Sequence, residues 1–265
     1  MKQNYAKCVA ICVVLLTATA AWAQSLQDAV ARGSVRIGVS QFIPWTFANR
    51  DGQLEGFEID VGRQVADEMG VEADFKVYEW DDIIGGIERG EIDFIAAGLA
   101  ITPGRALRVE YSLPYTESGA ALIVNKRLLP DAKNIDALNT KGVVVVAVGE
   151  TVSAELAPLF FDEAEIKTFT DGFAAEEEIL NDRAQVYLTS VPEADVLLRR
   201  YGDVVALLDK DPLPAWVAAF AVRPGNQSLL NFLNAWVTAR KADGWLEKTY
   251  DYWFGGDIWE TDAKP

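Results

Sequence analysis

The chain has 265 residues, no histidine, and two cysteines, Cys8 and Cys12; its formal charge is −16, from 24 basic and 40 acidic residues. Without histidine there is no His-ligated zinc site and no Ser-His-Asp or Cys-His machinery. The negative charge argues against a nucleic-acid or anionic-membrane partner, because both need basic patches. Half of the residues are hydrophobic and 24% are charged, which is typical of a globular chain.

Residues 1–23 have the features of a secretory signal peptide. Lys2 and Lys7 form a basic start, residues 9–18 are apolar, and Ala21-Trp22-Ala23 is a small-x-small cleavage site. The alternative, a transmembrane anchor, needs about 20 apolar residues, and this stretch is shorter. We therefore expect export to the bacterial periplasm. Cleavage would remove both cysteines and two lysines, leave a charge of −18, and make stability depend on the hydrophobic core.

Short apolar runs alternate with helical patterns along the first half of the chain. The expected strands are 35–39, 73–78 and 93–97, and the expected helices are 56–70 and 81–89, the second capped by Asp81 or Asp82. Asp51-Gly52 predicts a tight turn. Thr102 and Pro103 predict the cap and first position of a further helix.

The same alternation restarts after an extended run over residues 119–124. Further strands are expected at 143–148, 184–188, 204–208 and 215–222, and two helical stripes end the chain. The run Glu176-Glu177-Glu178 predicts an acidic, solvated first helical turn. This order predicts an α/β fold with largely parallel sheets. It also predicts two lobes joined by extended crossings near 118–122 and 216–221.

Four landmarks carry a resemblance to a known family. They are Gly56-Phe57-Glu58-Ile59-Asp60, Gly90-Glu91-Ile92-Asp93, the segment 97–105 that ends in Thr102-Pro103-Gly104-Arg105, and Tyr111-Ser112-Leu113-Pro114-Tyr115. Their order and spacing resemble those of the family 3 bacterial extracellular solute-binding proteins, the amino-acid receptors of ABC importers. The resemblance covers essentially all of the chain after residue 23.

The resemblance implies a type II periplasmic binding protein fold. Residues 24–118 and 219–265 would form lobe 1 and residues 119–218 lobe 2, each lobe a mostly parallel sheet flanked by helices, with a two-strand hinge between them. It implies a binding protein, not an enzyme, that closes on a small carboxylate or amino-acid ligand and delivers it to an ABC permease in the inner membrane. We expect a monomer without a cofactor or metal.

The resemblance also implies a set of ligand-binding residues. Arg105 matches the arginine that clamps the ligand carboxylate, a role suited to its planar bidentate fork. Gly98, Ala100 and Thr151 match positions that complete the carboxylate site, although Ala100 lacks the hydroxyl of many relatives. Phe42 and Trp80 match the aromatic wall, with Trp45 nearby.

One departure from the family pattern concerns the ligand ammonium. Where relatives have an aspartate, this chain has Ser190, next to Thr189, and no acid follows the first strand. Because an unpaired buried ammonium is costly, either the ligand lacks a free amino group or another acid takes this role. The candidates are Glu150 and Glu193.

Other interpretations of these residues stay open. Thr189 and Ser190 could only cap a helix, and Phe42 and Trp80 could be core aromatics. The chain could instead be an enzyme on the same fold, similar to a cyclohexadienyl (prephenate or arogenate) dehydratase. Such an enzyme needs a general acid, for which Glu150 or Glu193 is available. An accessory or sensor module is a third class.

Overall fold

The computed structural model describes residues 25–208 and 213–256. The expected signal peptide, residues 1–23 with Cys8 and Cys12, lies outside the described residues. One nine-stranded sheet runs through the molecule in the order β4-β1-β5-β11-β6-β9-β7-β8, with β10 beside β6. Its strands are β1 (Ser34–Val39), β4 (Glu72–Val77), β5 (Phe94–Ile95), β6 (Glu110–Asn125), β7 (Val144–Val148), β8 (Glu165–Phe169), β9 (Val186–Ser190), β10 (Val205–Leu208) and β11 (Ala215–Val222).

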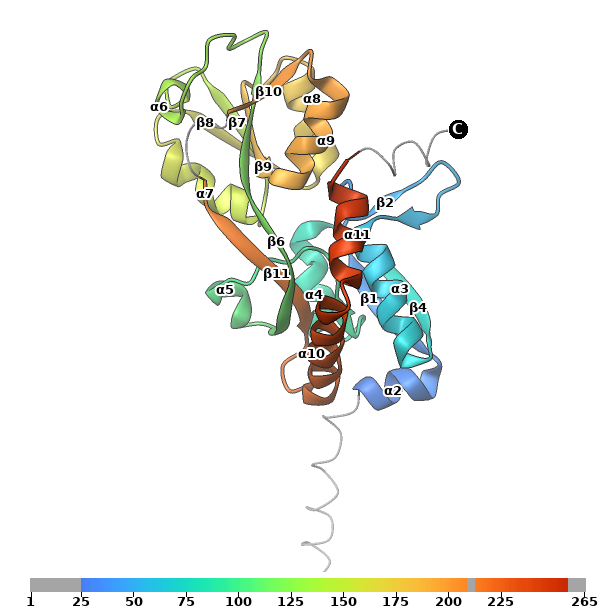
Figure 1. The fold of residues 1–265 in the computed structure, drawn as a ribbon. Coiled ribbons are helices and arrows are strands. Elements are labelled where there is room, and N and C mark those ends of the chain that lie inside the picture. Colours follow the sequence, from blue (N-terminus) through green and yellow to red (C-terminus); the bar gives the residue numbers. More distant parts are fainter. Residues whose placement is uncertain (1–24, 209–212, 257–265) are drawn as a thin grey trace, which may run out of the picture.

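Helices pack around this sheet at both of its ends, and a small hairpin stands apart from it (Figure 1). The hairpin pairs β2 (Phe47–Ala48) with β3 (Leu54–Glu55), as the Asp51-Gly52 turn predicts. The helices are α2 (Ser25–Arg32), α3 (Phe57–Met69), the 3₁₀ helix η1 (Trp80–Asp82), α4 (Ile83–Glu88), α5 (Pro103–Ala106), α6 (Ile135–Leu138), α7 (Val152–Phe160), α8 (Gly172–Leu180), α9 (Val191–Tyr201), α10 (Gln227–Ala242) and α11 (Trp245–Phe254).

Two long strands connect the two ends of the molecule. In Figure 1, β6 and β11 run side by side from the lower body to the upper one, and they pair antiparallel with Ser118 opposite Trp216. We call the lower body, with β1, β4, β5, α3, α4, α5, α10 and α11, lobe 1, and the upper body, with β7 to β10 and α6 to α9, lobe 2. Parallel pairs lie toward the outer ends, β1 with β4 and β5, and β7 with β8 and β9. Both long strands pair antiparallel with their neighbours, so the sheet as a whole is mixed and not largely parallel. The α/β two-lobe fold expected from the sequence is confirmed, while the residue boundaries of the lobes stay a prediction.

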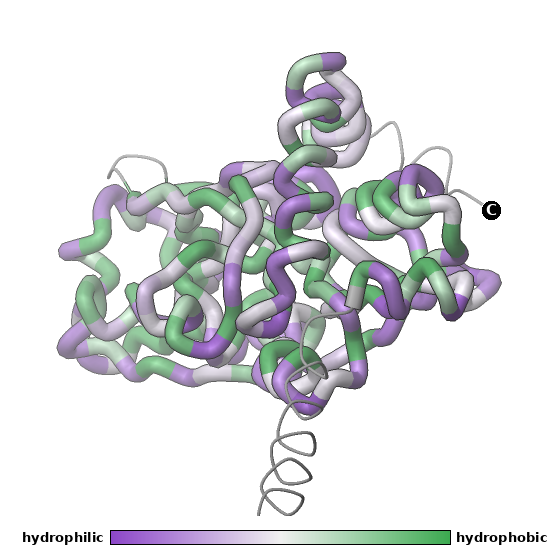
Figure 2. Tube along the Cα trace, turned by 90° about the horizontal axis from the view of Figure 1, so that it is seen from below, coloured by the Kyte–Doolittle hydropathy of each residue, from purple (hydrophilic) through white to green (hydrophobic). Residues whose placement is uncertain are grey.

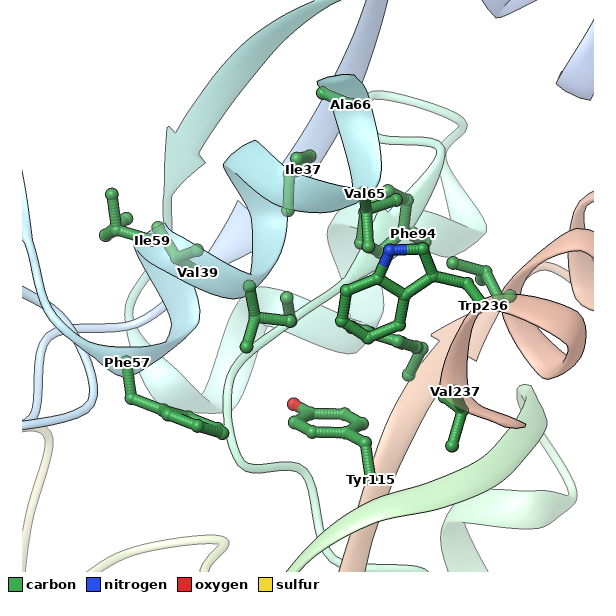
Figure 3. Packing of buried hydrophobic residues seen from close by; sticks show 14 of the residues in the cluster. Ile37, Val39, Phe57, Ile59, Val65, Ala66, Phe94, Tyr115, Trp236 and Val237 are labelled. Atoms are coloured by element: carbon green, nitrogen blue, oxygen red, sulfur yellow. The ribbon is translucent and has the colours of Figure 1, made fainter. Parts of the chain in front are cut away.

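Each lobe has its own buried apolar residues. Figure 3 shows the main cluster of lobe 1, in which α3 packs over β1 and an aromatic group from β6 and α10 lies below. Tyr115 stacks on Phe220 with ring centroids 4.3 Å apart, so the two long strands are anchored in this core. Separate clusters fill lobe 2 around Val146, Tyr187 and Leu122.

Hydropathy changes repeatedly along the outer helices. Figure 2 shows hydrophobic and hydrophilic positions alternating along the trace, as expected for elements with one buried face. Within residues 25–208 and 213–256, no helix is long and apolar enough to cross a membrane.

Three expectations need correction. Asp82 stands at the start of α4 but does not cap it, because its carboxylate accepts two hydrogen bonds from Arg89, both 2.8 Å. Glu176 to Glu178 lie in the middle of α8, whose cap is Asp171. Glu176 is half-buried, and burial, then the nearby Glu193, raises its pKa to about 7. The 184–188 strand is β9, displaced by two residues to end at Ser190.

Candidate functional site

A pocket lies between the two lobes, beside the connecting strands. The space between its walls is about 550 Å³, part of it open to solvent. Lobe 1 supplies Phe42, Trp45, Trp80, Ala97, Gly98, Ala100 and Arg105; the two long strands supply Ser118 and Trp216; lobe 2 supplies Val148, Thr151, Val152, Ser153, Leu188, Thr189, Ser190 and Glu193. Of the site residues expected from the sequence, only Glu150 is not part of this wall.

Arg105 is the cation of the pocket wall. Thr102 caps α5 as the sequence predicts, with its hydroxyl accepting the Arg105 N–H at 3.3 Å. The guanidinium is buried and donates to the carbonyl of Ala100 at 3.2 Å and to that of Glu150 at 2.7 Å. Its carbon lies 5.5 Å from the Trp80 ring centroid. Burial lowers the pKa of Arg105, but a guanidinium stays charged.

Glu150 contributes its backbone carbonyl to the site. Its φ of 61° is left-handed, which is uncommon for a residue other than glycine. The resulting carbonyl accepts from Arg105 and from the Trp80 indole, the latter at 3.0 Å. A main-chain carbonyl of lobe 2 thus accepts from two lobe 1 side chains, while a role of the Glu150 carboxylate toward the ligand stays a prediction.

Aromatic side chains form one side of the pocket. Phe42 and Trp80 meet edge to face, with centroids 5.5 Å apart. Trp45 is buried, packs against Phe254 and Phe57, and presents its ring to the pocket floor at Gly98. Trp45 therefore belongs both to the core and to the wall.

The pocket floor is fixed from below by a residue that the sequence did not indicate. Gly98 has a φ of 59° and donates its N–H to Glu58 Oε1 at 2.6 Å. Glu58 is fully buried and also accepts the Tyr115 hydroxyl, at 2.7 and 2.8 Å to its two oxygens. Burial raises the pKa of Glu58 to about 7. The Gly98 N–H is thus occupied, whereas Ala100 turns its carbonyl to Arg105 and the Tyr111 hydroxyl.

The lobe 2 wall begins at the N-terminus of α7. Thr151 caps this helix, accepting the Ala154 N–H at 3.1 Å and donating to the Val148 carbonyl at 2.6 Å. The next two residues, Val152 and Ser153, line the pocket. Their N–H groups belong to the first helical turn, where no intrahelical acceptor exists, and such a turn favours an anion.

Thr189, Ser190 and Glu193 continue this wall where β9 meets α9. The Thr189 hydroxyl and the Ser190 N–H both donate to Glu193 Oε2, at 2.6 and 3.1 Å. Burial raises the pKa of the Glu193 carboxyl, and these hydrogen bonds oppose that effect. Ser190 and Glu193 form the capping box of α9, in which each side chain accepts from the other residue's backbone N–H, so Ser190 begins this helix as one of the open interpretations expected.

Ser118 and Trp216 were not among the expected site residues. They are paired across β6 and β11 and lie in the two predicted crossings. Side chains alternate between the two faces of a strand, so every second residue of an extended crossing between lobes is expected to face the pocket. The predicted crossings could therefore have indicated these two residues. Within the described ranges, no group of three or more acids is arranged to hold a metal.

Comparison with known proteins gives several matches of nearly full length. The L-cystine-binding protein TcyJ of Escherichia coli K12 is 28% identical over 228 residues, which cover 86% of this chain and 85% of that protein. The crystal structure of an ancestral amino acid-binding protein, a precursor of cyclohexadienyl dehydratase, is 32% identical with a TM-score of 0.82 and covers 87% and 100% of the two chains.

A second solved structure has a similar TM-score to this chain. It is a putative binding component of an ABC transporter from Wolinella succinogenes, complexed with lysine, with 28% identity and a TM-score of 0.81, covering 87% of this chain and 99% of that one. The family model of the bacterial extracellular solute-binding proteins, family 3, matches residues 35–256. That match spans both lobes and both connecting strands, so this chain belongs to the bacterial extracellular solute-binding proteins of family 3.

Proposed function

We propose that this protein is the periplasmic solute-binding component of an ABC importer and that it binds an amino acid or amino-acid derivative between its lobes. The observation that carries the proposal is Arg105, a buried guanidinium in the interlobe pocket whose hydrogen bonds, within the described residues, go to two carbonyl groups and to no carboxylate. A buried cation without an anion is costly, so a ligand carboxylate is its natural complement.

Two further features support a carboxylate at this place. The N-terminal turn of α7 lines the pocket from lobe 2, and its free N–H groups favour an anion. The aromatic pair of Phe42 and Trp80 offers an apolar surface for the rest of the ligand. The relatives named above are an L-cystine-binding protein, an amino acid-binding protein and a complex with lysine.

Binding would act through closure of the lobes about β6 and β11. A ligand held by Arg105 on lobe 1 and by α7 on lobe 2 favours the arrangement in which both elements face it. The protein, acting as a monomer, would then dock on an inner-membrane permease.

Calorimetry on wild type and two arginine variants tests the proposal. The probes are the common L-amino acids and L-cystine. Arg105→Gln is expected to weaken binding of the best probe by about 30-fold or more, the cost of removing one partner of a buried charge pair. Arg108→Gln is the matched control, because Arg108 is exposed and pairs with Glu88 outside the pocket. Equal affinities of wild type and Arg105→Gln would refute the carboxylate clamp.

A second candidate function is a dehydratase acting on a prephenate-like acid. The observation in its favour is Glu193, a pocket acid whose raised pKa suits proton donation. One similar structure is described as a precursor of cyclohexadienyl dehydratase. Formation of an aromatic product from prephenate, absent in Glu193→Gln, would establish this activity; no product with wild type would exclude it. We favour the binding function.

A further inference from the structure

Glu58 is hydrogen-bonded to three parts of lobe 1 that shape the pocket. Its N–H donates to the Trp45 carbonyl at 2.9 Å, and its carboxylate accepts the Gly98 N–H at 2.6 Å and the Tyr115 hydroxyl at 2.7 and 2.8 Å. Trp45 and Gly98 line the pocket, and Tyr115 belongs to β6, one of the two strands that connect the lobes. One fully buried residue of α3 therefore joins the wall, the floor and a connecting strand.

The hydrogen bond to Gly98 fixes the orientation of the peptide between Ala97 and Gly98. In a trans peptide the N–H and the C=O point in opposite directions, so the Ala97 carbonyl is directed away from Glu58 while the Gly98 N–H is directed toward it. Ala97 and Gly98 both line the pocket, and within residues 25–208 and 213–256 the Ala97 carbonyl accepts no hydrogen bond. Rotation of this peptide would turn an N–H toward the pocket in place of a carbonyl, so its orientation decides the polarity of the floor.

The charge of Glu58 suits these partners. An ionised carboxylate only accepts hydrogen bonds, and both groups that face it, the Gly98 N–H and the Tyr115 hydroxyl, are donors. Hydrogen bonds to an ionised acceptor are also stronger than those to a neutral one. A protonated carboxyl or a glutamine amide instead turns a donor of its own toward Tyr115 and holds the Gly98 N–H with a neutral oxygen.

The same carboxyl changes its charge near neutral pH. Burial raises the pKa of Glu58 to about 7, and the hydrogen bonds from Tyr115 and Gly98 oppose that shift, to which no charged side chain of the described residues contributes. Burial and the adjacent Glu58 raise the pKa of Tyr115 well above its usual range, so its hydroxyl stays protonated. Glu58 is therefore the group of this cluster that titrates in the pH range of a binding measurement.

We propose that Glu58 is a positioning residue for ligand binding, whose ionised carboxylate holds the floor peptide at Gly98 against β6 in the orientation that the ligand requires. The inference rests on the proposed function, in which the ligand lies between the lobes against this floor. It adds a residue that is not part of the pocket wall, and it links affinity to proton loss beneath the pocket. A ligand that favours the ionised form lowers the pKa of Glu58 when it binds, so affinity falls as pH decreases below about 7.

The test compares wild type, Glu58→Gln and Glu58→Met by calorimetry at pH 5, 6, 7 and 8. The probe is the compound that wild type binds best among the common L-amino acids and L-cystine. Asp60→Asn is the matched control, because Asp60 lies on the same helix, also has a raised pKa, and accepts from the Trp253 indole at 2.8 Å, outside the pocket wall. Thermal melts of the same samples establish that each variant is folded, which separates loss of fold from loss of affinity.

The proposal predicts a loss of affinity that depends on pH. Glu58→Gln should bind the probe about 5-fold more weakly than wild type at pH 8 and equally at pH 5, where wild type also carries a neutral carboxyl. Glu58→Met, which offers no acceptor, should bind about 30-fold more weakly at pH 8, and Asp60→Asn should stay within about 2-fold of wild type at every pH. A role in stability alone would change the melting temperatures and leave the affinities equal.

Contrary results are distinguishable from failure of the carboxylate clamp. A ratio of wild-type to Glu58→Gln affinity that stays constant between pH 5 and pH 8 overturns the positioning role, and so does an equal loss in Asp60→Asn. If Glu58→Met does not fold, the pH dependence of Glu58→Gln still decides the question. A large loss in Arg105→Gln with no effect of Glu58→Gln leaves the clamp intact and removes only the role of Glu58, whereas a wild-type protein that binds no probe overturns both.

Discussion

Glu58 beneath the pocket floor should make the stability of this protein depend on pH near neutrality. The substitution Glu58→Gln removes its charge and keeps its shape. Burial raises the pKa of this carboxyl from an ordinary 4.5 to about 7, against the opposing hydrogen bonds from Tyr115 and Gly98. The folded state therefore binds a proton that the unfolded state has already lost between these two pH values.

The sign and size of the effect follow from this difference. Because the folded-state pKa is higher, Glu58 favours the folded state most at low pH, and the free energy of unfolding falls as pH rises from 4.5 through 7. The difference between the two pKa values corresponds to about 3 kcal/mol, of which about 2.5 kcal/mol is lost between pH 5 and pH 8. Carboxyls with lowered pKa, such as Asp82 and Glu88, act below this window.

Urea denaturation followed by tryptophan fluorescence at pH 5, 6, 7 and 8 measures this dependence. Wild type should lose stability across the series, and Glu58→Gln should lose about 2.5 kcal/mol less. Glu176→Gln is a useful comparison, because the pKa of Glu176 is also raised to about 7 in the other lobe. Parallel curves for wild type and Glu58→Gln would show that Glu58 is already ionised at pH 5 and would refute the reasoning.

Three backbone and interlobe features give further predictions. Gly56→Ala should lower the free energy of unfolding by about 3 kcal/mol or more, because φ is 127° and a Cβ would lie 2.3 Å from the Trp45 carbonyl oxygen. Gly70→Ala is the control, because Gly70 has a φ of 69° but open space around it, and it should lower the free energy of unfolding by about 1 kcal/mol. Thermal melts of both variants measure the difference. Trp80→Phe removes the indole donor to Glu150 and should weaken binding of the best amino acid by about 5-fold in calorimetry. Glu150→Gln should leave that affinity unchanged, whereas Glu150→Val should weaken it because a β-branched residue disfavours φ of 61°; equal effects of the two Glu150 variants would contradict its backbone role.

Local sequence signals predicted those features whose causes are local. Thr102 and Pro103 begin α5 because a hydroxyl and a ring with fixed φ suit those two positions, and neither needs the rest of the fold. The Asp51-Gly52 turn and the apolar run of β7 are of the same kind. The family resemblance then predicted that Arg105 and the aromatic pair of Phe42 and Trp80 line one pocket. Their distance from one another along the chain could not have shown this.

Features that depend on distant partners were not predicted. Glu58 looks like any acidic residue in the first turn of a helix, and its role comes from Gly98 and Tyr115, which are 40 and 57 residues away. Glu176 looked solvated because its neighbours Glu177 and Glu178 suggested an exposed face. Its burial comes from how α8 packs in lobe 2, which periodicity over three residues cannot show.

The carboxylate end of the proposed ligand and the rest of it would meet different kinds of group, and this bears on specificity. Beside Arg105, the donors expected for a carboxylate are main-chain N–H groups in the first turn of α7, which a change of side chain at these positions leaves in place. The rest of the ligand would lie against side chains of the wall such as Phe42 and Trp80, each of which a single substitution can replace. The same fold can therefore keep a preference for carboxylates while its preference for the remainder of the ligand changes.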